Sequence, residues 1–164
     1  MKMHYILKLL VAIGICQFVG NSGLLFTMSA IPTWYATLQK PWFNPPNWIF
    51  GPVWVVLYTL MGISLYLVWD KGLKHHGIKK AIYIFDLQIF LAQLVMNALW
   101  TFLFFGLHSP LYAFVEIIFL WIAIAVTIFR FYKVSKAAAW MLVPYLLWVT
   151  FASVLNYYVL ILNA

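Results

Sequence analysis

Five long apolar runs dominate the pattern of hydrophobic and polar positions along this chain. They cover roughly residues 6–28, 49–69, 81–107, 112–131 and 140–162. A helix needs about 20 mainly apolar residues to cross a bilayer, and these runs lack the alternation typical of a lipid-embedded barrel. The pattern predicts an all-α integral membrane protein, one domain over residues 1–164 built as a bundle of five transmembrane helices.

The first run shares one feature with a secretion signal, because Lys2 and Lys8 lie at its start. Its apolar stretch is longer than the core of a typical signal peptide, and no clear small-residue cleavage site follows it. We therefore expect the first helix to be retained.

Composition supports the membrane assignment, and the basic residues suggest an orientation. Hydrophobic residues make up 66% of the chain and charged residues 8%, whereas a soluble domain carries about 25% charged residues. Nine of the ten basic residues would lie on one side of the membrane, with Lys40 alone on the other. This bias predicts a cytoplasmic N-terminus, and we expect the membrane to be a prokaryotic cell membrane. The clustering disfavours a nucleic-acid partner.

The loop expected over residues 29–48 is rich in aromatic residues and prolines. Ordinary loops between helices are short and polar. Pro45 and Pro46 stiffen the segment that leads into the second helix. We interpret the loop as a lid over something flat and apolar.

Three of the expected helices carry aromatic faces at a similar depth below this loop. Residues three or four apart share one face of a helix. The faces consist of Trp54 and Tyr58 in the second helix, of Asn97, Trp100 and Phe104 in the third, and of Pro144, Trp148, Ala152 and Asn156 in the fifth. They indicate either a ligand pocket or ordinary packing between helices.

Polar residues inside a bilayer are costly and are candidates for function. Asn97 is the best placed, because its amide could bind a ligand carbonyl or carboxylate. The alternative is an interhelical hydrogen bond, which contributes about 0.6 kcal/mol. Asp86 is predicted to pair with Lys79 or Lys80, and Glu116 has no assignable partner.

Several conventional chemistries are disfavoured by the sequence. It has no Cys/His spacing of a metal site, no glycine-rich phosphate loop, and no Ser or Cys nucleophile with a nearby His and acid. We expect neither a metal nor a required cofactor, and we do not expect a conventional enzyme. The single cysteine, Cys16, is expected to be a small buried side chain.

Three ordered motifs resemble the translocator proteins, also called tryptophan-rich sensory proteins. The motifs are WYxxLxKPxxxPPxWxFxPVWxxLYxxMG over residues 34–62, NALWTFLFF over 97–105, and WMLVPYLLWVTFASVLNYY from Trp140 onward. The resemblance implies a five-helix bundle, commonly a homodimer, that acts as a membrane receptor or carrier. The implied ligands are tetrapyrroles such as protoporphyrin IX or haem, and similar flat hydrophobic molecules.

The motifs also imply which residues bind the ligand. Together with the face containing Phe104, they give a pocket under the first loop formed by Tyr35, Pro45, Phe50, Trp54, Tyr58, Asn97, Trp100, Phe104, Trp148 and Ala152. Some bacterial members are associated with light-dependent porphyrin degradation, in which case Trp54 and Trp148 would be catalytic. A membrane scaffold or stress regulator that binds no ligand stays a third hypothesis.

One departure from the family concerns sterols. The cholesterol-recognition segment of the family continues after the Leu-Asn-Tyr-Tyr motif to a basic residue, whereas here residues 155–158 are followed by VLILNA. The sequence pattern of such segments is weak in any case. The resemblance therefore does not extend to sterol recognition at this site.

Overall fold

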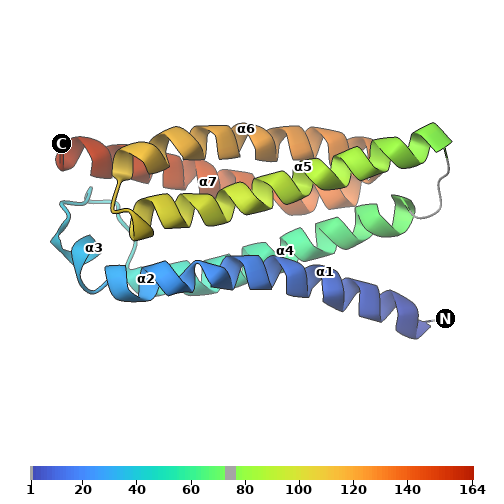
Figure 1. The fold of residues 1–164 in the computed structure, drawn as a ribbon, viewed down its shortest axis with the longest axis horizontal. Helices are drawn as coiled ribbons and strands as arrows, with labels where there is room; N and C mark the ends of the chain where they lie inside the picture. Colours follow the sequence, from blue (N-terminus) through green and yellow to red (C-terminus); the bar gives the residue numbers. More distant parts are fainter. Residues whose placement is uncertain (1, 73–76) are drawn as a thin grey trace.

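The computed structural model describes residues 2–72 and 77–164, and every regular element within these ranges is helical (Figure 1). The elements are α1 (Lys2–Ser22), α2 (Leu24–Ala30), α3 (Trp34–Thr37), α4 (Asn47–Gly72), α5 (Gly77–Thr101), η1 (Phe102–Gly106), α6 (Pro110–Val134) and α7 (Lys136–Leu162). The stretch η1 is π-helical and continues α5. The long helices lie side by side along one axis, with the two termini at opposite ends of the bundle.

In the described part of the chain, five helical stretches are long and apolar enough to cross a bilayer, which confirms the predicted membrane bundle. They are Met3–Ala30, Asn47–Gly72, Ile82–Gly106, Pro110–Val134 and Lys136–Leu162. Most of them extend beyond the predicted apolar runs, because polar residues also belong to the helix ends. Ser109 and Ser135 cap the N-termini of α6 and α7. Lys71 and Lys133 lie in the last turns of α4 and α6. The first span differs from the prediction, since α1 ends at Ser22 and α2 begins at Leu24.

Close contacts between small and large side chains hold the bundle together. A Cβ atom on Gly62 of α4 would lie 2.5 Å from the Cα of Ile13 in α1, so this approach requires glycine. On the other side of the bundle, Phe90 of α5 stacks on Phe131 of α6 with ring centroids 5.6 Å apart. The side chains of Met61 in α4 and Phe90 in α5 are fully buried, so closely packed side chains fill the interior between these helices.

Among the residues that the structure describes, two ion pairs link helices in the half of the bundle that contains the N-terminus. Lys8 lies 3.3 Å from Asp70, and Arg130 Nε lies 2.6 Å from Asp86 Oδ1. The Asp86 carboxylate thus contacts Arg130 of the neighbouring helix α6, a partner that the sequence analysis did not predict. The predicted pairing of Asp86 with Lys79 or Lys80 stays a prediction, because the side chains of those lysines lie outside the described residues.

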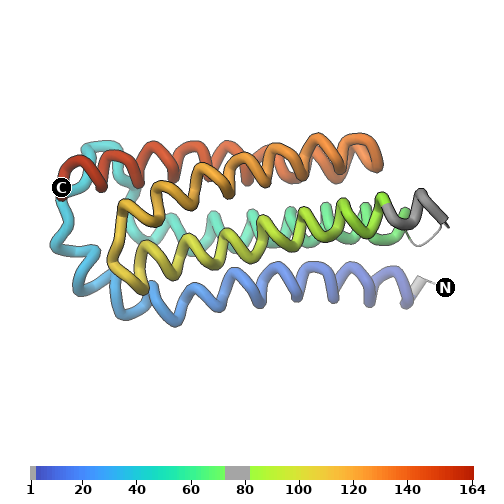
Figure 2. The backbone as a smooth tube through the Cα atoms, turned by 45° about the horizontal axis from the view of Figure 1, so that its top comes forward, coloured from blue at the N-terminus to red at the C-terminus, as the bar shows by residue number. Residues whose placement is uncertain are grey.

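Residues 31–46, which we call the lid loop, fold across the opposite end of the bundle, near the C-terminus (Figure 2). They contain the short helix α3, which the sequence pattern did not predict. The backbone N–H of Gln39 donates to Asn163 Oδ1 and the Asn163 amide donates to the Gln39 carbonyl, both at 2.9 Å. The Trp34 indole stacks on His108 with centroids 4.5 Å apart. These contacts tie the lid loop to the end of α7 and to the turn before α6.

Candidate ligand-binding cavity

A cavity of about 500 Å³ lies beneath the lid loop, between α1, α2, α4, α5, η1, α6 and α7. Sites for small molecules commonly enclose about 300–1,000 Å³ and are mostly apolar. None of the described residues that line this cavity is an Asp, Glu, Lys, Arg or His. Its size and wall therefore suit an apolar molecule.

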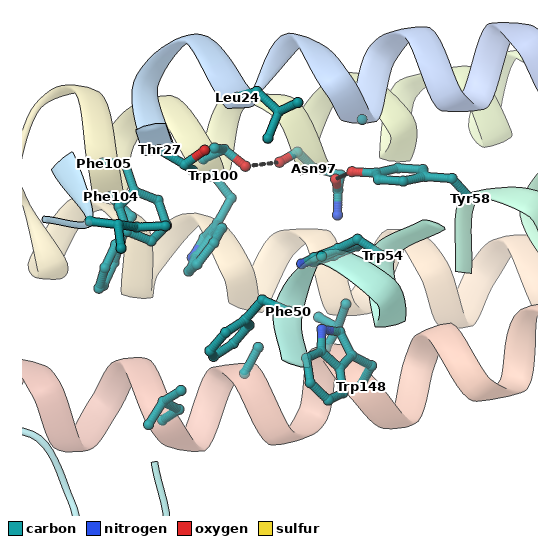
Figure 3. Close-up of a pocket in the computed structure, with 18 of the residues that line it drawn as sticks. Leu24, Thr27, Phe50, Trp54, Tyr58, Asn97, Trp100, Phe104, Phe105 and Trp148 are labelled. Carbon is teal, nitrogen blue, oxygen red and sulfur yellow. Dashed lines mark hydrogen bonds between the residues drawn. The ribbon is translucent and has the colours of Figure 1, made fainter. Parts of the chain in front are cut away.

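Nine of the described residues that line the cavity are aromatic (Figure 3). Trp54 stacks on Tyr58, with ring centroids 5.2 Å apart and planes inclined by 25°. Trp100 stacks on Phe104 at the same centroid distance, with planes inclined by 20°. The edge of Phe50 meets Trp148 at 5.9 Å. The three indoles come from α4, α5 and α7, so three helices must be assembled before the wall exists.

The structure brings nine of the ten predicted site residues to this one cavity. Pro45 is the exception, because the chain reaches the wall only two residues later, with Asn47 and Trp48 in the first turn of α4. Whether the nine residues bind a ligand stays a prediction. They are Tyr35, Phe50, Trp54, Tyr58, Asn97, Trp100, Phe104, Trp148 and Ala152.

Asn97 connects three helices through a buried hydrogen-bonded chain. The Tyr58 hydroxyl of α4 donates to Asn97 Oδ1, and Asn97 Nδ2 donates to the Tyr145 hydroxyl of α7 at 3.1 Å. All three side chains are buried. A primary amide has two N–H groups and two acceptor lone pairs. Asn97 therefore keeps one donor and one lone pair for the cavity that it also lines.

A second polar chain fixes the indole of Trp100. Its Nε1–H donates to Asn156 Oδ1 at 3.1 Å, and the Asn156 amide donates to the Pro110 carbonyl at 2.9 Å. The ring is therefore held between α5 and α7 before any ligand arrives. A wall fixed in advance loses less entropy on binding.

Tyr35 brings the lid loop into the wall. Its hydroxyl donates to Asn44 Oδ1 at 3.0 Å, and the Lys40 ammonium lies 4.6 Å from its ring centroid. Burial raises the pKa of the Tyr35 phenol, and the hydrogen bond to Asn44 opposes this shift only in part. The Tyr35 hydroxyl is therefore a protonated donor at neutral pH, and its bond to Asn44 joins two parts of the lid loop.

Comparison with known proteins identifies the family. Residues 12–162 match the model of the TspO/MBR family. The chain belongs to this family. It is 46% identical to the tryptophan-rich protein TspO of Archaeoglobus fulgidus, over 97% of this chain and 99% of the relative. It is 41% identical to the human translocator protein, over 86% of this chain and 76% of the relative.

The family recognised in the sequence is thus confirmed. A third relative, the tryptophan-rich sensory protein of Cereibacter sphaeroides, is 37% identical over 89% of each chain. Membership of the TspO/MBR family, together with these names and the five apolar spans, supports a multi-pass membrane protein with a receptor role.

The first span supplies a side of the cavity that the sequence analysis missed in this TspO/MBR chain. Its lining residues are Gln17, Gly20, Asn21, Gly23, Leu24 and Thr27. Gln17 and Asn21 lie four residues apart within an apolar run, with Gly20 on the same face. This face of polar and small residues could have indicated the cavity, because polar side chains are costly on a helix that faces only lipid.

Gly20 allows the Tyr58 ring to lie against α1. A Cβ atom there would overlap the ring, whereas a Cβ atom on Gly14, in the same helix, would meet nothing within 4 Å. We expect Gly20→Ala to lower thermal stability relative to Gly14→Ala by about 1–3 kcal/mol, the usual effect of overpacking. Both substitutions gain the same helix propensity, so their difference in thermal unfolding isolates the clash. Equal stability of the two variants would contradict the close packing of Tyr58 on Gly20.

Two buried polar side chains lie away from the cavity wall. In the described part of the chain, neither the Gln93 amide nor the Glu116 carboxyl has a hydrogen-bond partner. The sequence left the partner of Glu116 open. The structure shows that this side chain is buried on α6 and assigns it no hydrogen-bond partner among the described residues. Neither side chain lines the cavity.

Proposed function

We propose that this protein is a membrane receptor or carrier for tetrapyrroles such as protoporphyrin IX or haem, bound in the cavity beneath the lid loop. The observation that supports this most is the arrangement of Trp54, Trp100 and Trp148 around a single apolar space. Flat macrocycles stack on indole rings, and aromatic pairs contribute about 0.5–1.5 kcal/mol beyond the area that they bury. The free donor of Asn97 would orient a polar group of the ligand.

The test is a titration of tryptophan fluorescence with protoporphyrin IX, in darkness, on the purified protein in detergent. We expect saturable quenching at about one ligand per chain, because one cavity holds the three indoles. An unrelated tryptophan-rich membrane protein serves as the control. Quenching that does not saturate, and is no stronger than in the control, would leave the scaffold hypothesis.

A photochemical activity is the second candidate. Trp54 lies 5.2 Å from Tyr58 and 6.2 Å from Tyr145 between ring centroids, so an indole beside a photoexcited ring would have phenols next to it as electron donors. Illumination of the complex in air should then bleach the porphyrin to a defined product. Trp54→Phe and Trp148→Phe should abolish this reaction. Equal bleaching of free porphyrin in detergent would remove the hypothesis.

The oligomeric state of the proposed receptor is a separate question from its binding site. The residues that line the cavity are all described within a single chain, and we expect monomers and dimers alike to bind the ligand. Light scattering of the detergent-solubilised protein would give the oligomeric state, and titration of each fraction would show whether dimerisation changes the stoichiometry.

A further inference from the structure

The cavity is open on one side, between α2 and the first turns of α4. Six of the described residues both line the cavity and are exposed: Asn21, Leu24, Asn47, Trp48, Gly51 and Val55. The large apolar side chains among them are well exposed, with Leu24 at 48%, Val55 at 54% and Trp48 at 74%. A side chain that borders a cavity and the outer surface at once lies at an opening. Figure 3 shows Leu24 across the cavity from Trp148, which is half-buried.

The first span passes the opening at Gly23, the single residue that separates α1 from α2. Up to Gly20, α1 packs against Tyr58 of α4. Beyond the break, α2 packs on η1, where Phe26 meets Phe102 with ring centroids 5.2 Å apart. A Cβ atom on Gly23 would lie 2.9 Å from the Thr101 methyl group, so the break itself lies against α5. The first span thus packs on α4 below the cavity and on η1 beside it.

Gln17 marks the inner edge of the opening. Its amide donates to the Val55 carbonyl at 2.9 Å and to Thr59 Oγ1 at 3.0 Å. These bonds join α1 to α4 one to two turns below Leu24. The opening therefore ends at a fixed edge and does not continue down the bundle.

The sides of the opening belong to Met3–Ala30 and Asn47–Gly72, two of the helical stretches long and apolar enough to cross a bilayer, so we place the opening toward the bilayer. The route from the water phase is covered by the lid loop, which is bonded to Asn163 and stacked on His108. An apolar molecule dissolved in the bilayer meets the opening directly, without crossing an aqueous layer. A water-soluble molecule would first have to displace the lid loop.

We infer that ligands reach the cavity sideways from the bilayer, through a portal formed by Leu24, Trp48, Gly51 and Val55, with Gln17 as its inner edge. The partner that this portal fits is a flat apolar molecule dissolved in the membrane. The inference rests on the proposed binding function and adds the route to it.

Gly51 provides a way to obstruct the portal without disturbing the fold. It is exposed and lines the cavity, and a Cβ atom there would meet nothing within 4 Å. Gly14 is also exposed and open but lies on α1 outside the cavity wall. Gly51→Phe and Gly14→Phe are therefore matched variants, one at the portal and one away from it.

The decisive measurement is stopped-flow quenching by protoporphyrin IX with each variant in lipid nanodiscs. We expect Gly51→Phe to slow association and dissociation by about tenfold each while changing the equilibrium affinity much less, because a narrowed route slows both directions. Gly14→Phe should behave like the wild type. Unchanged rates in Gly51→Phe would overturn the portal, and so would slower association with unchanged dissociation, which would place the new ring in the binding site itself.

A second readout does not depend on the tetrapyrrole. Bimane attached to Gly51→Cys in a Cys16→Ser background should be quenched by lipids brominated on their acyl chains and not by aqueous iodide. Quenching by iodide alone would show that the opening faces water and would overturn the portal even if binding is real. If wild-type protein shows no saturable binding while bimane is quenched by the lipids, the proposed function fails and the lipid-facing opening stands.

Discussion

Replacement of Trp54 or Trp148 by alanine is expected to weaken protoporphyrin IX binding by about tenfold to a hundredfold, which corresponds to roughly 1.4–2.8 kcal/mol. Each substitution removes a large flat side chain from the cavity wall. Each also removes the partner of another wall ring, Tyr58 for Trp54 and Phe50 for Trp148. The measurement is the quenching titration in darkness, with binding constants fitted for each variant.

The chain supplies its own controls for this experiment. Trp42 and Trp140 are 95% and 66% exposed, and neither lines the cavity. Trp42→Ala and Trp140→Ala should therefore bind like the wild type, although each lowers the total fluorescence by one indole. Equal affinity in Trp54→Ala, Trp148→Ala and these controls would contradict the assignment of the cavity as the binding site. Thermal unfolding of every variant would separate lost affinity from lost structure.

The second large effect is expected in stability, from Asn97→Leu. The substitution leaves the hydroxyls of Tyr58 and Tyr145 without the amide that joins them. An orphaned buried polar group costs about 1–3 kcal/mol, far more than the net value of an average hydrogen bond between membrane helices, about 0.6 kcal/mol. Thermal unfolding in detergent should show the loss.

A rescue experiment distinguishes this explanation from simple loss of packing. Tyr145 is 1% exposed, whereas Tyr58 is 7% exposed and borders the cavity. Adding Tyr145→Phe to Asn97→Leu should therefore restore more stability than adding Tyr58→Phe, because removing both partners of a buried bond can be nearly neutral. If neither second substitution restores stability, the hydrogen-bonded chain is not what Asn97 contributes.

The aromatic faces were predictable because helical periodicity alone places residues three and four apart together. Trp54 and Tyr58 stack as that spacing implies. The stretch η1 was not predictable, since nothing in the letters FLFFG signals a π-helical turn. That turn brings both Phe104 and Phe105 to the cavity, although a regular helix would direct them about 100° apart.

Other features depended on contacts between elements that the sequence does not pair. The described partner of Asp86, Arg130, lies 44 residues away on another helix, and local spacing could not select it. The contribution of the first span was missed for a related reason: its apolar run resembles any lipid-facing helix until Gly20 is seen against Tyr58. Pro45 was assigned from the motif, and a motif gives adjacency in the chain without giving the direction in which the loop faces.

The arrangement of the wall also bears on how the protein assembles. Helices α6 and α7 are joined through Ser135 alone and pack extensively, so they can pair as soon as both are inserted. The cavity instead needs α1 against α4 and α4 against α7, contacts between segments far apart in the chain, which form late because loop closure opposes them. A molecule that fills the cavity binds only the finished bundle and stabilises it by mass action. Supplying such a molecule during expression should therefore raise the yield of folded protein.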